Sequence, residues 1–254
     1  MKNRRSLTIG WIYPELMNIY GDRGNILVLK KRCEWRGISA NIKYLTLGFA
    51  PSDIKKCDII MMGGAQDIQQ QIVEKDILSK KRLLAEVIES GISGLFVCGA
   101  YQTLGKYYKD ADGNIIKGLE IFDHYTVSPG EGAKRLIGNL AAELNLKTPS
   151  KIRIIVGFEN HGGRTYLGKK AKPLAYVLNG NGNNGEDKTE GAVYKNSIGT
   201  YMHGAILPKN PHLADFLILN ALKKKYQVNK LLELDDTEEM RAHDLIAKRM
   251  GVEI

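Results

Sequence analysis

The alternation of short apolar segments with helical ones in the first half of the chain constrains its fold most. Four segments have strand character and two between them have helical spacing: strands at 7–13, 38–47, 57–64 and 95–98, helices at 24–36 and 76–91. Continuous apolar strands that alternate with helices predict βαβ units, in which helices cover both faces of a parallel sheet. We therefore expect an α/β fold whose mostly parallel sheet is flanked by helices.

The second half is richer in strands, and no linker or repeat divides the 254 residues. The expected elements are strands at 121–127, 151–159, 172–178 and 196–204, then a helix at 212–226. One large α/β domain of this length buries a sizeable core. We expect a domain over residues 1–226 and a C-terminal helical extension over 227–254. The Asn/Gly-rich stretch 179–191 predicts a flexible loop.

Charge and cysteine content limit the classes of function. The formal net charge of +9 favours anionic partners. Cys33, Cys57 and Cys98 include no C-x-x-C pair, which argues against a disulfide framework or a zinc ribbon and favours a reducing, cytoplasmic setting. No apolar run reaches the roughly 18 residues of a membrane span. The apolar part of the N-terminal segment is too short for a signal peptide, so we expect the segment to form the first strand.

The stretch SGLFVCGAYQTLG (93–105) places Cys98 between an apolar strand and a helix. Ligand sites of open α/β sheets lie at the carboxyl ends of the strands. A sharp strand-turn-helix requires small residues after a nucleophile, and Gly99 and Ala100 meet that requirement. The N–H groups of a following helix favour a thiolate. Cys98 is thus either a nucleophile or a buried, inert cysteine; the local sequence leaves both open.

A cysteine nucleophile needs a base, and two of the five histidines are candidates. His203 ends an apolar strand in GTYMHG, and His161 lies in GFENHGG. A strand end late in the chain can meet a nucleophile at the edge of the same sheet, which favours His203. The turn YGDRGN (20–25) predicts a helix start that Asp22 or Asn25 caps.

Several motifs together carry a resemblance to a known family. They are IYGDRGN (19–25), MMGGAQD (61–67), CGAYQ (98–102), KRLIGN (134–139), GFENHGGRT (157–165), NGNGNN (179–184), EGAVYKN (190–196) and YMHG (201–204). Over residues 7–225 the chain resembles class I glutamine amidotransferases, in the branch shared with cobyric acid synthase, and within it the GatD subunits of lipid II isoglutaminyl synthase. The resemblance implies their flavodoxin-like fold, with the amidotransferase domain over 1–226.

The resemblance also implies roles for individual residues. Cys98 is expected to attack the side-chain amide of glutamine, and His203 to act as its general base. Backbone N–H groups of Gly64 and Gly99 are expected to form the oxyanion hole. Arg135 matches the arginine that holds the glutamine substrate, and its fork suits a carboxylate.

This chain departs from the wider pattern at two positions. The glutamate that many class I amidotransferases have two residues after the catalytic histidine is replaced by Ala205. We therefore expect a Cys98–His203 dyad whose third group, if any, comes from a partner subunit. The glycine usual two positions before the nucleophile is Phe96.

The sequence predicts neither a metal site nor a cofactor on this chain. GRTYLGKK (163–170) nearly matches a P-loop, but it lacks the final Ser/Thr, and Pro173 blocks the helix that should follow. ATP and magnesium are therefore expected on a partner, which the resemblance implies is a Mur-ligase-like subunit (MurT) in a heterodimer. Its acceptor would be D-isoglutamate in the lipid II stem peptide, at the inner face of the membrane, during peptidoglycan synthesis.

Two other functions stay open at this point. The first is an amidotransferase for a corrinoid or another acid, although such enzymes usually carry their ATP-binding domain on the same chain. The second is a non-catalytic module that binds nucleic acid through its basic surface, in which case binding would weaken steeply with salt. The presence of both Cys98 and His203 argues against the module.

Overall fold

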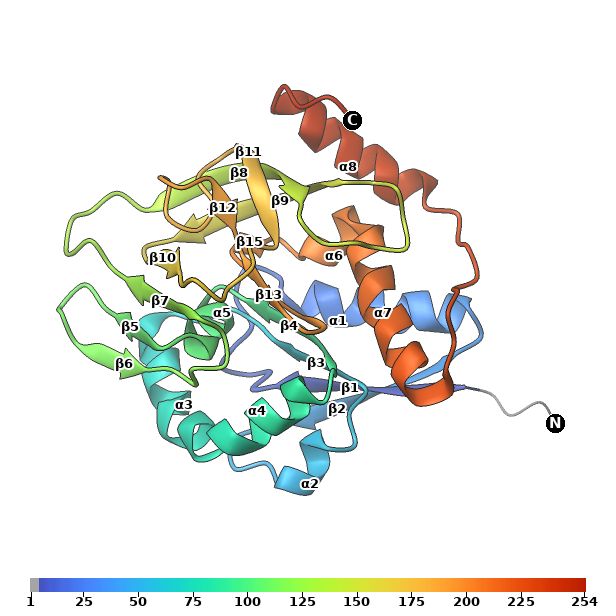
Figure 1. Ribbon diagram of the computed structural model, residues 1–254, viewed down its shortest axis with the longest axis horizontal. Helices are drawn as coiled ribbons and strands as arrows, with labels where there is room; N and C mark the ends of the chain where they lie inside the picture. The colour runs from blue at the N-terminus through green and yellow to red at the C-terminus, as the bar shows by residue number, and fades with distance from the viewer. Residues whose placement is uncertain (1–4) are drawn as a thin grey trace.

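The computed structural model describes residues 5–254, and a six-stranded sheet lies at its centre (Figure 1). Its strand order is β13-β14-β4-β3-β1-β2, in which only the edge strand β13 is antiparallel. The strands are β1 (Ser6–Ile12), β2 (Ser39–Leu45), β3 (Ile59–Met62), β4 (Ser93–Val97), β13 (Ala192–Tyr194) and β14 (Ser197–Thr200). The mostly parallel sheet expected from the sequence is confirmed, and its strands are apolar because both faces are covered.

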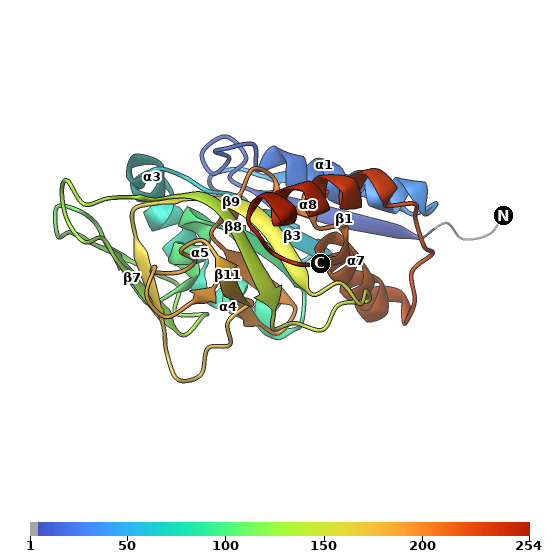
Figure 2. The same cartoon turned by 90° about the horizontal axis from the view of Figure 1, so that it is seen from above.

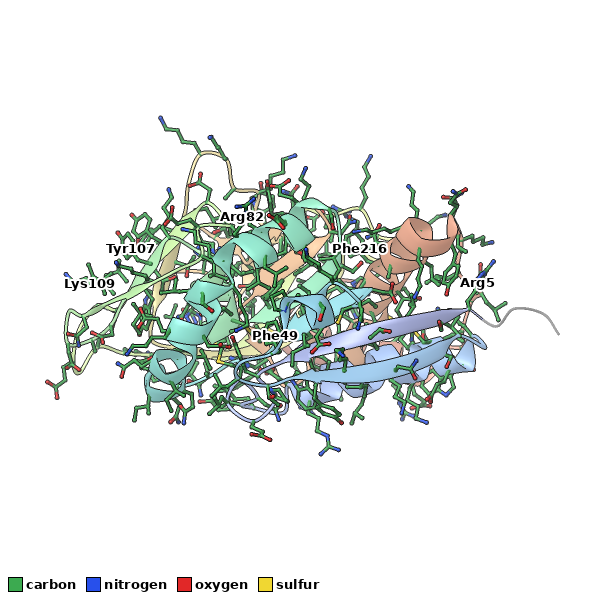
Figure 3. All side chains as sticks on the ribbon, turned by 90° about the horizontal axis from the view of Figure 1, so that it is seen from below. Arg5, Phe49, Arg82, Tyr107, Lys109 and Phe216 are labelled. Atoms are coloured by element: carbon green, nitrogen blue, oxygen red, sulfur yellow. The ribbon has the colours of Figure 1, made fainter. Side chains whose placement is uncertain are left out.

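Helices cover the two faces of this sheet. α1 (Arg23–Trp35) packs on β1 and β2, and α7 (Pro211–Tyr226) packs beside it on β3 and β4. The connection from β3 to β4 runs in the opposite direction across the sheet, so a right-handed crossover places its helices on the other face. These helices are α3 (Asp67–Ser79) and α4 (Lys81–Glu89), and Figure 3 shows α4 on the side of β1 and β2 opposite to α1.

The helix expected at 76–91 is therefore two helices. Lys80 leaves the helical backbone at φ −103°, which ends α3 and starts α4. The first helix begins in the polar stretch DIQQQ, where few apolar residues mark a helical face. Val73 and Ile77 are the fully buried apolar residues of α3, and such sparse spacing is a weak signal in a sequence.

Two further sheets lie beside the central one. The five-stranded sheet has the order β12-β11-β8-β9-β15 and the four-stranded sheet β10-β7-β5-β6. Their strands are β5 (Tyr107–Lys109), β6 (Ile115–Lys117), β7 (His124–Val127), β8 (Leu136–Leu144), β9 (Ile154–His161), β10 (Arg164–Leu167), β11 (Ala175–Asn179), β12 (Thr189–Glu190) and β15 (Met202–His203). The long strand β8 and the pair β5–β6 were not expected from the sequence.

The strand expected at 196–204 is divided between two sheets. β14 pairs with β4 in the central sheet, and after Tyr201 the chain continues as β15, which pairs with β9 in the five-stranded sheet. The apolar run is continuous because both halves are buried, which hides the change of sheet in the sequence. The segment around His203 therefore connects the two sheets.

The C-terminal segment packs onto the rest of the molecule. The short helix α6 (Ile206–Lys209) and strand β9 contact α8 (Thr237–Arg249), which lies across β8 and β9 in Figure 2. Ala247 of α8 is buried with Ala141 and Val156 in a small apolar cluster. The segment before α8 is fixed by Arg32 of α1, whose guanidinium bonds to Asp236.

The buried core follows the central sheet, while charged side chains such as Arg82 and Lys109 project outward (Figure 3). The remaining helices are short: α2 (Pro51–Ile54) and α5 (Gly99–Leu104). Within residues 5–254, each helix is too short or too polar to cross a membrane.

Candidate active site

Cys98 lies at the carboxyl end of β4 in a strained backbone conformation. Its φ is +51° and its ψ −108°, a region that residues with a side chain rarely adopt. Gly99 begins α5 directly afterwards, and a Cβ on Gly99 would come within 3.2 Å of the Ala65 backbone nitrogen. Phe96 fits two positions before the nucleophile because Gly94 leaves room for its ring. The geometry is that of a nucleophile elbow.

His203 lies beside Cys98, with Gly64 between them. A Cβ on Gly64 would lie 2.8 Å from His203 Cε1 and 3.3 Å from Cys98 Cβ. The backbone N–H of Cys98 donates to Thr200 O at 2.8 Å, which ties the ends of the two neighbouring strands together. The structure thus brings the nucleophile and the base predicted from the sequence to one place.

The electrostatics around His203 favour its charged form. Burial of the ring lowers the pKa of His203, but the charges of Cys98 and Asp22 outweigh this and raise it to about 10. The edge of the Tyr20 ring covers the imidazole, with ring centroids 5.0 Å apart. The imidazolium that forms when His203 takes a proton from Cys98 is therefore stabilised, as a base paired with a cysteine nucleophile requires.

A carboxylate of the same chain stands behind the imidazole. Asp22 is fully buried, and its Oδ1 lies 3.5 Å from His203 Nδ1. The expectation that Asp22 or Asn25 caps α1 is wrong: Asp22 holds the N-cap position, but its side chain makes no capping hydrogen bond. Asn18 Oδ1 instead accepts from Arg23 N at 2.8 Å, and Asn25 Oδ1 accepts from Leu207 N at 3.0 Å.

The loop after β3 supplies backbone donors next to the thiol. The N–H of Gly64, expected in the oxyanion hole, instead donates to Asp22 Oδ2 at 2.6 Å. The next backbone nitrogen, that of Ala65, lies beside Gly99. Because the Gly64 amide already has an acceptor, the backbone N–H groups of Ala65 and Gly99 are the candidates for an oxyanion hole that remain beside the thiol.

A cavity of about 530 Å³ opens from Cys98 and contains Arg135. Arg135 comes from the start of the segment that forms β8, and its guanidinium is fixed by Asn160. Its Nε donates to Asn160 Oδ1 and its Nη2 to Asn160 O, both at 3.0 Å. Asn160 Nδ2 in turn donates to Tyr20 OH at 3.1 Å. Asn160 thus holds both Arg135 and Tyr20, whose ring covers His203.

His161, the rival candidate for the base, also lines the cavity but is held differently. Its ring stacks on Tyr201, with centroids 3.7 Å apart, and its Nδ1 donates to Gly163 O at 2.8 Å. Burial lowers the pKa of His161, so the neutral ring is favoured. His161 therefore lines the cavity as a neutral, stacked ring. His203 is the imidazole next to Cys98 and Gly64.

The Asn/Gly-rich stretch 179–191 is built into the structure rather than left as a flexible loop. Buried Glu159 accepts hydrogen bonds from Asn181 N, Asn181 Nδ2 and Gly182 N at 2.7–2.9 Å. Asn183 is fully buried and bonds to Gly191 through both its side-chain atoms. The Asn/Gly-rich composition predicted a flexible loop because it carries no information about hydrogen-bond partners elsewhere in the chain.

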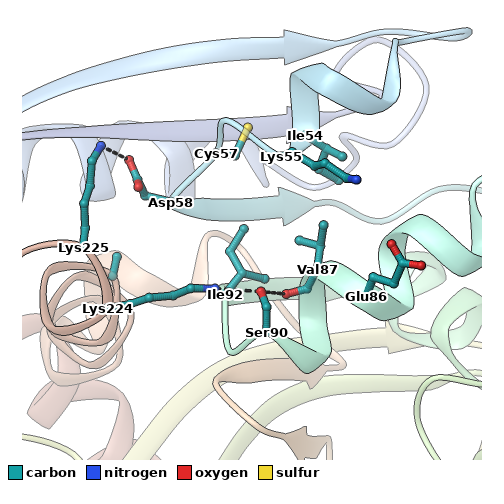
Figure 4. Close-up of a pocket in the computed structure, with 11 residues that line it drawn as sticks. Ile54, Lys55, Cys57, Asp58, Glu86, Val87, Ser90, Ile92, Lys224 and Lys225 are labelled. Atoms are coloured by element: carbon teal, nitrogen blue, oxygen red, sulfur yellow. Dashed lines mark hydrogen bonds and ion pairs between the residues drawn. The ribbon is translucent and has the colours of Figure 1, made fainter.

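A second cavity lies at the opposite, amino-terminal ends of the strands (Figure 4). Its volume is about 390 Å³, and Cys57, Asp58 and Ser90 line it with three lysines. Lys225 pairs with Asp58 at 2.8 Å and Lys224 donates to Ser90 Oγ at 2.7 Å. Because these polar groups bind each other, this cavity offers no chemistry comparable to that around Cys98.

Comparison with protein families places these features in a known group. Residues 8–211 match the family described as the CobB/CobQ-like glutamine amidotransferase domain. The GatD subunit of lipid II isoglutaminyl synthase (glutamine-hydrolysing) of Staphylococcus aureus is 40% identical over 245 residues, 96% of either chain. The subunit of the same name in Streptococcus pneumoniae is 41% identical over 220 residues, 87% of this chain and 82% of that one.

More distant relatives agree in fold. A cobyric acid synthase of Clostridium botulinum is 30% identical over 210 residues, which are 79% of this chain but 39% of that protein. Among solved structures, PurLQS from Thermotoga maritima matches with a TM-score of 0.57 at 13% identity, over 86% of this chain and 97% of that one. A structure described as a glutamine amidotransferase also has a TM-score of 0.57, at 12% identity over 84% and 98% of the two chains.

Proposed function

Because this chain belongs to the CobB/CobQ-like glutamine amidotransferase family, we propose that it is the glutamine-hydrolysing subunit of a lipid II isoglutaminyl synthase. The observation that carries the proposal is the placement of Cys98 and His203 on either side of Gly64, at the mouth of a cavity that contains Arg135. The similarity to the GatD subunits extends over most of their length, which supports this function over that of the wider family.

Glutamine binding begins at Arg135. The fork of its guanidinium, held in place by Asn160, binds the α-carboxylate of the amino acid. The side-chain amide then reaches Cys98. Holding the amide beside the thiol in one orientation supplies a large part of the rate enhancement.

The chemistry proceeds by attack of Cys98 Sγ on the amide carbon. His203 takes the thiol proton, and the amides of Ala65 and Gly99 receive the negative charge that develops on the carbonyl oxygen. His203 then returns the proton to the leaving nitrogen, the C–N bond breaks, and ammonia departs from a thioester. Water, deprotonated by His203, attacks the thioester carbon, and glutamate leaves while the thiol is restored.

Ammonia is consumed on a partner subunit. We propose a MurT-like Mur ligase, which activates the α-carboxyl of D-isoglutamate in the lipid II stem peptide with ATP and magnesium. The basic surface, with a formal net charge of +9, suits an anionic acceptor at the inner face of the membrane. The three free cysteines fit the reducing cytoplasm in which this heterodimer would work.

The corrinoid alternative is less well supported, because the chain spans well under half of the cobyric acid synthase that it resembles. A non-catalytic binding module would not need the strained backbone at Cys98 or the buried base beside it.

The test is release of glutamate from L-glutamine by the purified chain, alone and co-purified with a Mur-ligase-like subunit. We expect release by the native chain or complex and its loss, by at least about 10³-fold, in Cys98→Ala. Glutamine labelled with ¹⁵N in the side-chain amide should transfer its label to isoglutamine in lipid II only in the complete complex. Hydrolysis that survives in Cys98→Ala would exclude Cys98 as the nucleophile.

A further inference from the structure

We infer that Asp22 is the positioning residue of the catalytic base: one buried carboxylate orients His203 and also fixes the loop of the oxyanion hole. The inference deepens the proposed glutaminase activity and rests on it for the name of the reaction. The observations behind it, the contacts of the two Asp22 side-chain oxygens, do not depend on which reaction is catalysed.

The two oxygens of Asp22 serve two different parts of the site. Oδ1 lies 3.5 Å from His203 Nδ1, and Oδ2 accepts the N–H of Gly64 at 2.6 Å. Both Asp22 and His203 are fully buried. An approach of 3.5 Å is longer than a normal hydrogen bond, but catalytic hydrogen bonds are often long in free enzymes and shorten when substrate binds.

The carboxylate decides which nitrogen of His203 accepts the thiol proton. A carboxylate at Nδ1 accepts a hydrogen bond, so the neutral ring carries its proton on Nδ1 and presents the lone pair of Nε2. It also stabilises the imidazolium that forms when Nε2 takes the proton. The position two residues after His203, where many class I glutamine amidotransferases have a glutamate, is Ala205 here, and Asp22 supplies an acid from the other end of the chain.

The rest of the motif around Asp22 braces the same segment. A Cβ on Gly24 would come within 2.6 Å of Ala205 Cβ, so only glycine lets α1 approach the residues after His203. Asn25 Oδ1 accepts the N–H of Leu207 at 3.0 Å. Three residues of four in DRGN thus contact the base, its loop or the segment that follows it, and this explains the motif better than helix capping does.

Three other groups also face His203 and would experience the loss of the Asp22 charge. They are the thiol of Cys98, the ring of Tyr20 and, through Gly204 O, the ammonium of Lys209. Cys98 and Tyr20 have roles of their own, and Lys209 contacts only the backbone. Asp22 is the buried acid of the described chain that contacts both the base and the Gly64 loop.

The test compares Asp22→Asn with the native chain and with Asp58→Asn, a matched charge loss at the opposite end of the sheet. Asparagine can still accept from Gly64 N, but its NH₂ group then faces Nδ1 and favours the wrong tautomer. We expect kcat for glutamine hydrolysis, measured with the partner subunit, to fall by about 10³–10⁴-fold with KM changed less than about threefold.

Alkylation of Cys98 by iodoacetamide supplies a readout that a merely structural role would not move. The alkylation rate reports how readily His203 takes the thiol proton, a transfer that Asp22 assists through Nδ1 in the native chain. In Asp22→Asn the rate at each pH should be lower than in the native chain, because the base holds the proton less tightly without the carboxylate. Asp58→Asn should match the native chain in kcat and in alkylation profile.

If Asp22→Asn matches the native chain in kcat and in alkylation profile, the inference is overturned. If that variant does not fold, judged by its melting temperature, ¹⁵N NMR of His203 in the Cys98→Ala chain decides instead. A neutral ring protonated on Nδ1 supports the inference, and one protonated on Nε2 overturns it. Absence of glutamate release in the native complex would defeat the proposed function but leave the alkylation and NMR results as tests of Asp22.

Discussion

At the scale of single residues, Gly64 contacts the acid, the base and the nucleophile of the site. Its amide donates to Asp22, and the space that a side chain would occupy is already taken by His203 on one side and Cys98 on the other. A methyl group there would lie 2.8 Å from His203 Cε1, closer than real Cβ contacts come. Gly64 is therefore the residue whose lack of a side chain lets acid, base and nucleophile converge.

Arg135 gives the first prediction at this scale. If its guanidinium binds the α-carboxylate of glutamine, Arg135→Ala should raise KM by about 10–100-fold, the loss of one charged hydrogen-bonded contact. kcat should change little, because the contact is equally strong in the ground state and the transition state. Steady-state kinetics of glutamate release measure both constants.

The controls for Arg135 separate charge from geometry. Arg135→Lys should recover only part of the affinity, because an ammonium lacks the fork that a carboxylate matches. Arg82→Ala removes a surface charge on α4 and should leave KM as it is. An unchanged KM in Arg135→Ala would place the carboxylate elsewhere in the cavity.

The sequence identified part of this site for a physical reason. Cys98 and His203 follow strands, and strands of one parallel sheet end at the same edge, so local patterns together with the family resemblance were enough to pair them. Asp22 was taken for a cap because capping is a local interaction, readable over a few residues. Its real partner lies about 180 residues away, and only the packing of α1 against Ala205 brings the two together.

At the scale of elements, helix α1 connects the two ends of the chain. Its first turn contacts the segment after His203, and its last turns hold the C-terminal segment through Arg32 and Arg36. Arg32 is 1% exposed and bonds to both Asp215 of α7 and Asp236 before α8. The domain boundary after residue 226 stays a prediction. The segment that follows it is held to the domain by the buried guanidinium of Arg32.

Removing that cation should loosen the C-terminal segment. Arg32→Met keeps the side-chain volume but leaves Asp236 without its partner and Asp215 with Arg36 alone. We expect a loss of about 3 kcal/mol in the free energy of unfolding, near the low end for a broken buried ion pair because Asp236 stays 26% exposed. Urea denaturation measures the loss, and limited proteolysis should show earlier cleavage between α7 and α8.

The matched control is again Arg82→Ala, whose pair with Glu86 is on the surface. Its side chain is 94% exposed, and such pairs contribute at most about 1 kcal/mol. If Arg32→Met and Arg82→Ala lose the same amount of stability, the buried cluster does not anchor the segment.

The elements that the sequence predicted well are those that contain a nearly continuous run of buried apolar residues. β1, β4 and α7 each contain such a run and were expected close to their observed bounds. β8 was missed because its first half is largely exposed and its buried residues lie only in the second half, where Glu143 is again exposed. The division of 197–203 between two sheets was also hidden, since a buried strand looks the same in either sheet.

At the scale of the whole molecule, one buried acid makes stability depend on pH. Burial raises the pKa of Glu190 to about 7 from 4.5, although Thr200 Oγ1 and Tyr201 N donate to it. The folded state therefore holds this proton more tightly than the unfolded state. The resulting stabilisation is complete below pH 4.5 and is lost as pH rises through about 7.

Glu190→Gln should remove this dependence. A neutral amide cannot ionise, so the variant should gain up to roughly 3 kcal/mol over the native chain between about pH 4.5 and pH 7. Chemical denaturation at a series of pH values measures the difference. Glu15→Gln, at an exposed position, should follow the native curve, and parallel curves for Glu190→Gln and the native chain would refute a shifted Glu190.

The pairing of β4 with β14 has a consequence for biosynthesis. Cys98 N bonds to Thr200 O, so β14, which leads directly to the base His203, is added to the central sheet about 100 residues after the nucleophile has been made. At ~5–20 residues per second, a ribosome needs about 5–20 seconds to cover that interval. During this time the nascent chain has its thiol but neither its base nor its finished cavity. Synthesis order therefore delays glutamine hydrolysis until the segment that contains His203 has been made, and chains that terminate before it lack the base.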